Sequence, residues 1–362
     1  MSQKENQIPM TAEIKALLLS VGSADVEDHK LILPTLKSTA GPSAGSSGSV
    51  FINSGGRRVR LNIDQNAPLK IRKLPESDEI GIYLAENSSE SSENASGSTE
   101  SSPDSSEKSF EKLIATGKIE PVLAHCPDQA YINLSEKCIY DCKFCSVPIL
   151  QGHTKTKEES LKIVRNAFEK GPMKAISITS GVEKTPEGEL ERVLELMPEL
   201  KKYNVPIGIS IYAVSGGSKK LKDAGVSEVK YNIEVADPEI FKDVCPGLSK
   251  TDVFAELEEA VSLFGRGNVY SNLIVGLGET DESAEQTVEK LAEIGVIACI
   301  RPIYENALRK GECFMKRPSK ERLLKLFEMQ KRISEKYDLH PEKSETMCSL
   351  CSGCDMVPGR DD

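Results

Sequence analysis

The stretch Cys138-Ile-Tyr-Asp-Cys142-Lys-Phe-Cys145 decides how this chain is interpreted, because it places three cysteines at C-x3-C-x2-C spacing. It directly follows a strand-like segment at residues 130–135. Three thiolates this close in sequence can bind three corners of a [4Fe–4S] cube. The stretch offers no fourth cysteine, so one iron would stay open for chemistry, whereas a structural metal site normally closes its coordination sphere.

The spacing, with an aromatic residue before the third cysteine, resembles the signature of the radical S-adenosylmethionine (SAM) enzymes. The resemblance implies that Cys138, Cys142 and Cys145 bind the cluster and that its open iron chelates SAM. Reduction then cleaves SAM to a 5'-deoxyadenosyl radical, which takes a hydrogen atom from a substrate. The alternative is a zinc knuckle completed by His153, since zinc sites use comparable spacings.

The composition is that of a globular protein kept in a reducing compartment. The chain has 362 residues, of which 38% are hydrophobic, and a net charge of −10. We expect no nucleic-acid partner, because phosphate binding needs excess Lys and Arg, and no apolar stretch reaches membrane-spanning length. Six of the ten cysteines fall in two tight triplets, which indicates metal binding rather than disulfides. A cytoplasmic location follows, because no secretory signal begins the sequence.

The sequence predicts three parts: a β-rich accessory domain at 1–125, a core at 126–312, and a closing helix with a cysteine-rich tail at 313–362. The first part should contain a helix and a strand within 11–36, a hairpin formed by 49–53 and 57–63, and strands at 69–72 and 80–84. The glycine-rich loop at 38–48 is either a flexible linker or a phosphate-binding loop. The Ser/Glu-rich stretch at 87–108 should be a disordered insertion.

Strand and helix patterns alternate from residue 128 onward. The expected strands are 130–135, 175–180, 205–212, 228–236, 269–275 and 296–304. The expected helices are 158–171, 186–203, 218–224, a stretch reaching 264, 282–294 and 319–337. Six βα repeats imply a parallel sheet with right-handed crossovers. The predicted fold class is therefore α/β, and the core of radical SAM enzymes is such a sheet, a partial (β/α)6 barrel.

Polar and glycine-bearing segments follow several of these strands, where ligands gather in parallel sheets. By resemblance to the superfamily, Thr179, Ser180 and Gly181 would contact the SAM amino group, and Glu234 would accept hydrogen bonds from the ribose. Gly276 and Glu279, which by the same resemblance would also contact SAM, lie in a G-L-G-E-T ending that is nearly identical in biotin and lipoyl synthases. Asn272 stands where the family pattern has a glycine, so the approach to the adenine should differ slightly.

A second triplet, Cys348, Cys351 and Cys354, has the C-x2-C-x2-C spacing of a ferredoxin run without its fourth cysteine. Three interpretations compete: an auxiliary [4Fe–4S] cluster with a remote fourth ligand, a zinc site, and a tail that is ordered by a partner. Cys313, just past the last strand, is our first candidate for the fourth ligand. Candidates in falling order after it are Cys126, Cys245 and Cys299, of which the last two are expected to be core thiols.

The core resembles the biotin synthase and lipoyl synthase branch of the radical SAM enzymes over about residues 126–310. In those synthases an auxiliary cluster supplies sulfur, so we expect sulfur insertion into an unactivated C–H bond. A tail triplet and an N-terminal β-rich domain depart from both synthases. The alternatives are a radical maturase, mutase or methylase whose second cluster relays electrons, and a non-catalytic iron–sulfur or zinc scaffold. The low potentials of such clusters imply an electron donor such as ferredoxin or flavodoxin, anaerobic conditions, and a small-molecule or carrier-bound substrate.

Overall fold

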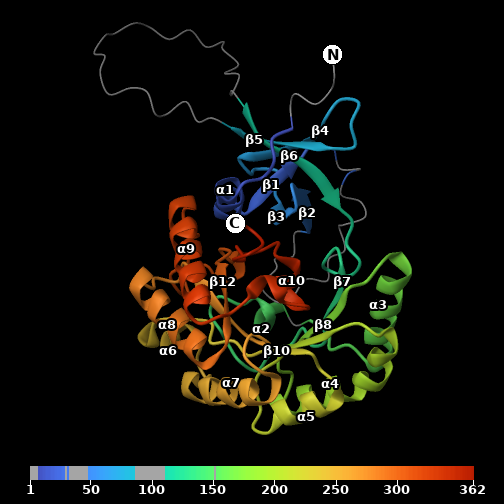
Figure 1. The fold of residues 1–362 in the computed structure, drawn as a ribbon, viewed down its shortest axis with the longest axis vertical. Helices are drawn as coiled ribbons and strands as arrows, with labels where there is room; N and C mark the ends of the chain where they lie inside the picture. The colour runs from blue at the N-terminus through green and yellow to red at the C-terminus, as the bar shows by residue number, and fades with distance from the viewer. Residues whose placement is uncertain (1–6, 29–30, 32–47, 86–110, 151) are drawn as a thin grey trace, which may run out of the picture.

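A computed structural model describes residues 7–28, 31, 48–85, 111–150 and 152–362. The predicted loop at 38–48, apart from its last residue, and the predicted insertion at 87–108 lie outside these described residues. Figure 1 shows two parts stacked on each other, a smaller N-terminal one and a larger C-terminal one.

The N-terminal part is a closed six-stranded barrel, with strand order β1-β3-β2-β6-β5-β4. Its elements are α1 (Ala12–Val21), β1 (Ser23–Val26), β2 (Ser49–Ser54), β3 (Arg57–Ile63), β4 (Leu69–Lys73), β5 (Ile80–Ala85) and β6 (Glu111–Glu120). The predicted hairpin is confirmed: β2 and β3 run antiparallel, with Ile52 opposite Val59. Strand β6 was not predicted, because its charged and glycine residues blur the apolar alternation that identifies a strand.

The C-terminal part is a parallel six-stranded sheet in the order β12-β11-β10-β9-β8-β7. Its strands are β7 (Gln129–Asn133), β8 (Ala175–Thr179), β9 (Ile207–Ser210), β10 (Glu228–Lys230), β11 (Val269–Val275) and β12 (Ile297–Pro302). The covering helices are α3 (Lys157–Lys170), α4 (Pro186–Leu200), α5 (Gly217–Ala224), α6 (Pro238–Val244), α7 (Lys250–Phe264), α8 (Asp281–Ile294) and α9 (Lys320–Lys336). The predicted βα alternation is confirmed. The stretch that reaches 264 is two helices rather than one, because Pro246 and Gly247 interrupt it.

The sheet curves around the C-terminal tail. Gln129, on edge strand β7, donates a 2.8 Å hydrogen bond to the carbonyl oxygen of Met347. Arg301, on the opposite edge strand β12, lies 2.9 Å from the sulfur of Cys348. Since Met347 and Cys348 are neighbours in the one-turn helix α10 (Met347–Cys351), both edges meet the same segment. The sheet is therefore an open (β/α)6 barrel, and the tail lies inside its curve.

The tail also joins the two parts of the molecule, and Figure 1 shows α10 and the C-terminus between them. Lys15 of α1 is fully buried and lies 2.6 Å from a carboxylate oxygen of Asp361. Its ammonium group also donates to the carbonyl oxygen of Ser352, at 2.7 Å. Removing one partner of such a buried ion pair typically costs about 3–5 kcal/mol. The tail is thus held firmly against the N-terminal barrel.

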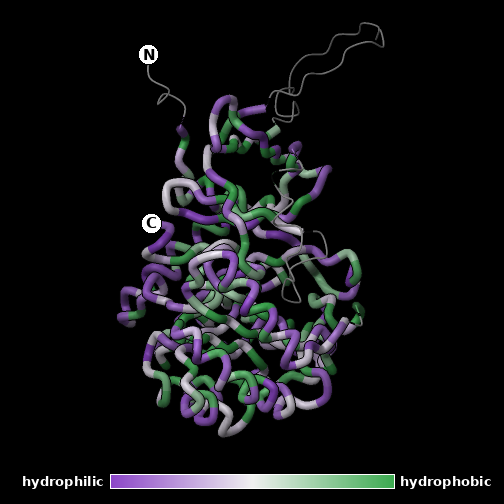
Figure 2. Tube along the Cα trace, turned by 90° about the vertical axis from the view of Figure 1, so that its right-hand side faces the viewer, coloured by the Kyte–Doolittle hydropathy of each residue, from purple (hydrophilic) through white to green (hydrophobic). Residues whose placement is uncertain are grey.

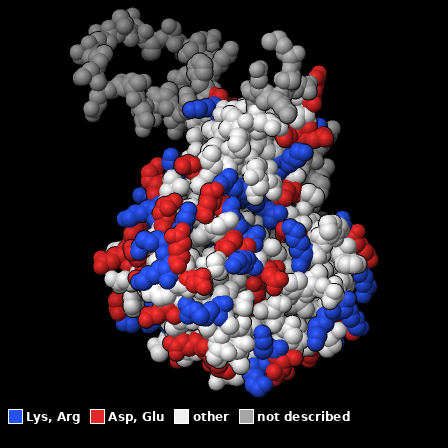
Figure 3. Space-filling view, in the orientation of Figure 1, with Lys and Arg blue, Asp and Glu red and all other residues white. Residues whose placement is uncertain are grey.

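Hydrophobic segments run through both parts (Figure 2), and each part has a core of its own. On the face in Figure 3, acidic and basic side chains are interspersed over the helices of the core. No helix among the described residues is long and apolar enough to cross a membrane.

Candidate cluster sites

The first cysteine triplet lies in the loop after β7, at the carboxyl edge of the sheet. Three backbone hydrogen bonds shape this loop. Two reach outside it: Ile139 N–H donates to the Val182 carbonyl at 2.7 Å, and Lys143 N–H donates to the Val244 carbonyl at 2.8 Å. The third lies within the loop, where Cys145 N–H donates to the Cys142 carbonyl at 2.9 Å. The loop is thereby fastened to the chain that follows β8 and to α6. Its three thiols are close enough to influence one another's charge.

Arg309 holds this loop from the other side of the barrel mouth. Its guanidinium donates to the carbonyl oxygen of Cys145 at 2.8 Å and forms ion pairs with Asp141 and Glu312. Its side chain is only 3% exposed. Because Arg309 follows the last strand of the sheet, it connects the cysteine loop to the opposite edge of the barrel.

The surroundings of the first triplet disfavour free thiolates. Burial raises the pKa of Cys138 and raises that of Cys145 to about 12. A hydrogen-bonding interaction with Cys245, followed by burial, raises the pKa of Cys142. The nearby carboxylates of Asp141 and Glu234 act in the same direction. The three thiols therefore keep their protons until a cation replaces them, as expected where metal binding releases protons.

The residues after β8 pack against this cysteine loop. Gly181 is required there, since a Cβ would lie 2.3 Å from the Lys137 carbonyl oxygen. Ser180 donates to Glu189 at 2.7 Å, and the carbonyl oxygen of Thr179 accepts from Leu134 N–H at 2.8 Å. These contacts occupy the Ser180 hydroxyl and the Thr179 carbonyl. Contact between this segment and SAM stays a prediction.

Glu279 makes its contacts within the protein, to its own loop and to α9. One carboxylate oxygen accepts from Gly276 N–H and the other from Leu277 N–H, both at 2.8 Å. Arg322 of α9 lies 2.7 Å away, and the Glu279 side chain is fully buried. Gly276 itself has a φ of +107°, and a Cβ there would lie 2.3 Å from the Lys316 carbonyl oxygen. Glu279 therefore fixes the loop after β11, and its contact with SAM stays a prediction.

Glu234 occupies the space between the two cysteine triplets. It follows β10, has a φ of +58°, and forms an isolated bridge with Leu273. Burial raises the pKa of its carboxyl to about 7, although a hydrogen bond from Asn232 and the charges of Lys230 and Arg301 oppose that shift. Glu234 also influences the charge on Cys142 and Cys145. Its contact with a ribose stays a prediction.

The second triplet is placed by α10 and the turn that follows it. The one-turn helix sets Cys348 and Cys351 on one face, three residues apart. Ser352 then adopts the left-handed conformation, with φ at 51°, and its N–H donates to the Cys348 carbonyl at 2.6 Å. The chain reverses there, so that Cys354 lies near Cys351 and within reach of its charge.

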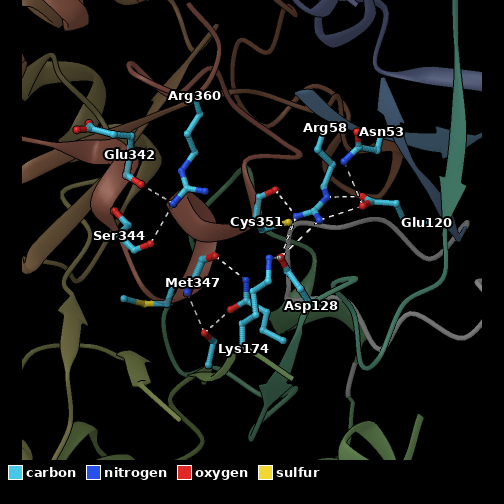
Figure 4. A network of polar contacts seen from close by, with 12 residues as sticks. Asn53, Arg58, Glu120, Asp128, Lys174, Glu342, Ser344, Met347, Cys351 and Arg360 are labelled. Carbon is cyan, nitrogen blue, oxygen red and sulfur yellow. Dashed lines mark hydrogen bonds and ion pairs between the residues drawn. The ribbon is translucent and has the colours of Figure 1, made fainter. Parts of the chain in front are cut away.

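Cationic side chains surround this second triplet. Lys230 Nζ lies 3.2 Å from the sulfur of Cys348. A guanidinium nitrogen of Arg301 lies 2.9 Å from the same sulfur. Arg58 donates to the Cys351 carbonyl at 3.0 Å and pairs with Glu120 and Asp128, as Figure 4 shows. The pKa of Cys351 is lowered, first by a hydrogen bond with Cys126 and also by the charge of Arg58.

The remaining cysteines divide between the two sites, and the structure places our first candidate for a fourth tail ligand, Cys313, beside the first triplet. Cys313 packs in the same side-chain cluster as Cys142, Cys145 and Cys245, at the first triplet. It follows β12, and parallel strands put such residues at their carboxyl edge. The tail instead contacts residues that begin strands, such as Gln129 and Glu228, and from there its Cys348 reaches Lys230 and Arg301 inside the barrel. Cys126, which precedes β7, lies there, and so does the buried Cys299 of β12, 3.6 Å from the Ser349 hydroxyl.

The zinc interpretations find little support in this geometry. His153 is mostly exposed and contacts Glu159 at 2.9 Å, in the capping box of α3. Among the described residues, no three Cys, His, Asp or Glu side chains are placed to share one metal ion. A [4Fe–4S] cube does not require that arrangement, because each thiolate binds a different iron.

Sequence reasoning missed the side chains that position both triplets. Lys230 and Arg301 fall within the predicted strands 228–236 and 296–304 without a predicted role. Arg309 and Glu189 were not singled out. A signal was present, because a charged residue within a buried strand is uncommon unless it is paired. The arginines of β3 carried no such signal, since charged residues are common on a strand that has one solvent-facing side.

The comparisons with known proteins agree with this geometry. Residues 132–291 match the family model of the radical SAM superfamily. A biotin synthase from Hydrogenobaculum sp. (strain Y04AAS1) is 29% identical over 45% of this chain and 50% of its own length. A lipoyl synthase from Histophilus somni is 25% identical over 46% of this chain and 53% of its own length. The crystal structure of methylornithine synthase superimposes with a TM-score of 0.47 and 18% identity, covering 55% of this chain and 62% of that one.

The chain spans about half the length of the curated relatives that it matches. The match includes the first cysteine triplet and the loops after β8, β10 and β11, and it ends before the tail. Residues 132–291 are therefore a radical SAM domain, similar to that of the biotin and lipoyl synthases.

Proposed function

We propose that this chain is a radical SAM enzyme with two iron–sulfur clusters and that it inserts sulfur into an unactivated C–H bond. Cys138, Cys142 and Cys145 would hold the first [4Fe–4S] cluster, and Cys348, Cys351 and Cys354 would ligate the second. When bound and reduced, the first cluster would supply the electron that cleaves SAM. The relatives named biotin synthase and lipoyl synthase support the reaction class.

One observation carries the proposal: both triplets face the interior of the same curved sheet. Glu234 is close enough to Cys142 and Cys145 to influence their charge. The charges of Lys230 and Arg301 in turn lower the pKa of Glu234, and both of these side chains contact Cys348. A substrate bound between the triplets would thus meet SAM on one side and the tail cluster on the other. Asn133 and Asn272 carry buried polar atoms without hydrogen-bond partners and are candidates to bind it.

The chain's own residues would prepare this chamber. Arg309 and Glu189 would hold the loops that carry the first triplet, and Glu279 would hold the loop after β11. Lys230 and Arg301 would offset the negative charge of the tail cluster. A ferredoxin or flavodoxin in a reducing cytoplasm would be the electron donor, and the substrate would be a small molecule or a group on a carrier protein.

Two measurements test the proposal. Reconstituted protein is mixed with SAM and dithionite, and 5'-deoxyadenosine is quantified; the enzyme should form it, whereas a scaffold would not. In the second measurement, candidate fatty-acyl and dethiobiotin-like substrates are supplied for a single turnover, and acid-labile sulfide is followed. Loss of sulfide that depends on the tail cysteines supports sulfur insertion. Product formation with all sulfide retained would favour a relay of electrons, and with it the maturase, mutase or methylase alternative.

A further inference from the structure

We propose that Cys126 is the fourth ligand of the tail cluster, so that four thiolates enclose a [4Fe–4S] cluster beneath the N-terminal barrel. The inference rests on the auxiliary cluster of the proposed function and adds its missing ligand. It also assigns a role to the N-terminal barrel, which would cover the site.

The four sulfurs gather at one place. Arg58 joins the two segments, because its guanidinium lies 3.5 Å from Asp128, two residues after Cys126, and donates to the Cys351 carbonyl at 3.0 Å. Cys348, Cys351 and Cys354 are all close enough to influence the charge on Cys126. Cys126, Cys348 and Cys351 are 3%, 9% and 5% exposed. The four residues come from two segments far apart in sequence, which is the arrangement that a tail triplet with a remote fourth ligand requires.

A tight turn holds Cys126 in place. The carbonyl oxygen of Cys126 accepts a 2.9 Å hydrogen bond from Leu123 N–H. His125, inside the turn, has a φ of +71°, a conformation that non-glycine residues seldom adopt. Such strain is retained where the surrounding structure fixes it, frequently at functional positions. The turn directs Cys126 toward the tail rather than leaving it in the sheet.

The buried charges require an anion at this place. Within the described residues Lys15 pairs with Asp361, Arg58 with Glu120 and Asp128, and Arg301 with Asp355. Lys230 and Arg60 are each 3% exposed. Among the residues that the structure describes, neither Lys230 nor Arg60 has a carboxylate within ion-pair distance. Two buried cations without counter-charges would be costly.

Four thiolates around a [4Fe–4S]2+ core carry two net negative charges, and this matches the two cations. Lys230 contacts Cys348 directly, at 3.2 Å, while Arg60 is close enough to influence the charge on Cys354. Four protonated thiols would leave both cations without an anion in contact. The charge balance therefore favours a metal-bound state of this site.

The N-terminal barrel closes the site from outside. Arg60 N–H, on β3, donates a 2.6 Å hydrogen bond to the carbonyl oxygen of Gly353, between Cys351 and Cys354. A Cβ at Gly353 would lie 2.9 Å from the ring of Phe51 on β2. The barrel thus packs directly on the cysteine turn. With four protein ligands, no iron of this cluster would be open to bind a substrate through oxygen or nitrogen.

The test isolates the tail site by using a Cys138/Cys142/Cys145→Ala chain, here called the core-triplet variant. After anaerobic reconstitution, iron, zinc and acid-labile sulfide are counted, and EPR spectra are recorded after reduction and after mild oxidation. We expect about four irons per chain in the core-triplet variant. Adding Cys126→Ala should reduce this to about three or fewer and produce the EPR signal of a three-iron cluster on oxidation.

Cys299→Ala is the matched control, because Cys299 is also buried beside the tail but is not expected to bind iron. It should retain about four irons and an unchanged spectrum. Cys126→Ser, which can offer an oxygen ligand, should retain the cluster with altered g-values. The far-UV circular dichroism spectrum and gel-filtration volume of Cys126→Ala should match those of the unsubstituted chain, and this shows that the variant folds.

The inference is overturned if Cys126→Ala keeps about four irons with an unchanged spectrum, or if Cys299→Ala loses them instead. Either result would leave the auxiliary cluster itself in place. Zinc in place of iron would overturn the inference as well. A core-triplet variant that holds no metal would refute the auxiliary cluster, and with it that part of the proposed function.

Discussion

The two cysteine triplets differ most in the charge that surrounds them. Carboxylates of Asp141 and Glu234 lie near the first triplet, whereas Lys230, Arg301 and Arg58 surround the second. A three-thiolate [4Fe–4S] cluster carries only one net negative charge, and SAM brings a positive sulfonium. Acidic surroundings suit a cationic cosubstrate, and cationic surroundings suit a closed, more negative cluster. This difference supports the proposal that SAM binds at the first site and a resident cluster at the second.

The largest expected effect is the loss of SAM cleavage in Cys142→Ala. Without this thiolate the first cluster would have two ligands and could not be retained. Formation of 5'-deoxyadenosine with dithionite should fall to background. Cys245→Ala is the control, because Cys245 packs in the same side-chain cluster as Cys142 but is not expected to bind iron. An undiminished rate in Cys142→Ala would refute the assignment of the first site.

Glu279→Ala should weaken SAM binding without removing either cluster. The substitution deletes two backbone hydrogen bonds and the Arg322 ion pair, so we expect a loss of about 1–3 kcal/mol in the free energy of unfolding. Denaturant unfolding and SAM titration by calorimetry would measure both effects. Asp281→Ala removes a more exposed partner of Arg322 and should cost less than about 1 kcal/mol. Equal losses in the two variants would contradict the positioning role of Glu279.

Lys230→Met should lower the reduction potential of the tail cluster. A nearby cation stabilises the reduced, more negative state, so its removal should shift the potential downward by on the order of 50–150 mV. A redox titration followed by EPR in the core-triplet variant would measure the shift. Lys219→Met, on the exposed face of α5, should leave the potential unchanged. An upward shift or no shift in Lys230→Met would exclude a tail cluster beside Lys230.

Glu234→Gln should change the pH dependence of stability in the metal-free protein. The folded state holds the Glu234 proton up to a pKa of about 7, against an ordinary value of 4.5. Between those values the folded chain binds more protons than the unfolded chain, so wild-type stability falls as pH rises. Over this pH range the free energy of unfolding of the variant should fall by roughly 1–2 kcal/mol less than that of the wild type, after allowance for solvent screening. Identical slopes in thermal or denaturant unfolding would argue against the raised pKa.

The core fold and the first triplet could be predicted because their signals are local. Apolar strands such as Val269–Val275 and the spacing of Cys138, Cys142 and Cys145 are visible within a few residues. The tail site could not be placed in this way. Choosing between Cys126 and Cys313 requires knowing which edge of the sheet the tail occupies, and long-range contacts such as Gln129 with Met347 decide that.

Glu279 shows a second limit of sequence reasoning. Its motif indicated a ligand-contacting acid, yet its carboxylate satisfies the backbone of its own loop and an arginine more than forty residues away. A motif records that a side chain is needed, whereas only the structure shows what that side chain touches.

The most direct test of the account is iron and acid-labile sulfide per chain after anaerobic reconstitution, in the wild type and in Cys348/Cys351/Cys354→Ala. The account predicts about eight irons in the wild type and about four in the variant, with SAM cleavage retained by the variant. About four irons in both proteins would contradict it, because the tail would then hold no cluster and the cations around it would need another explanation.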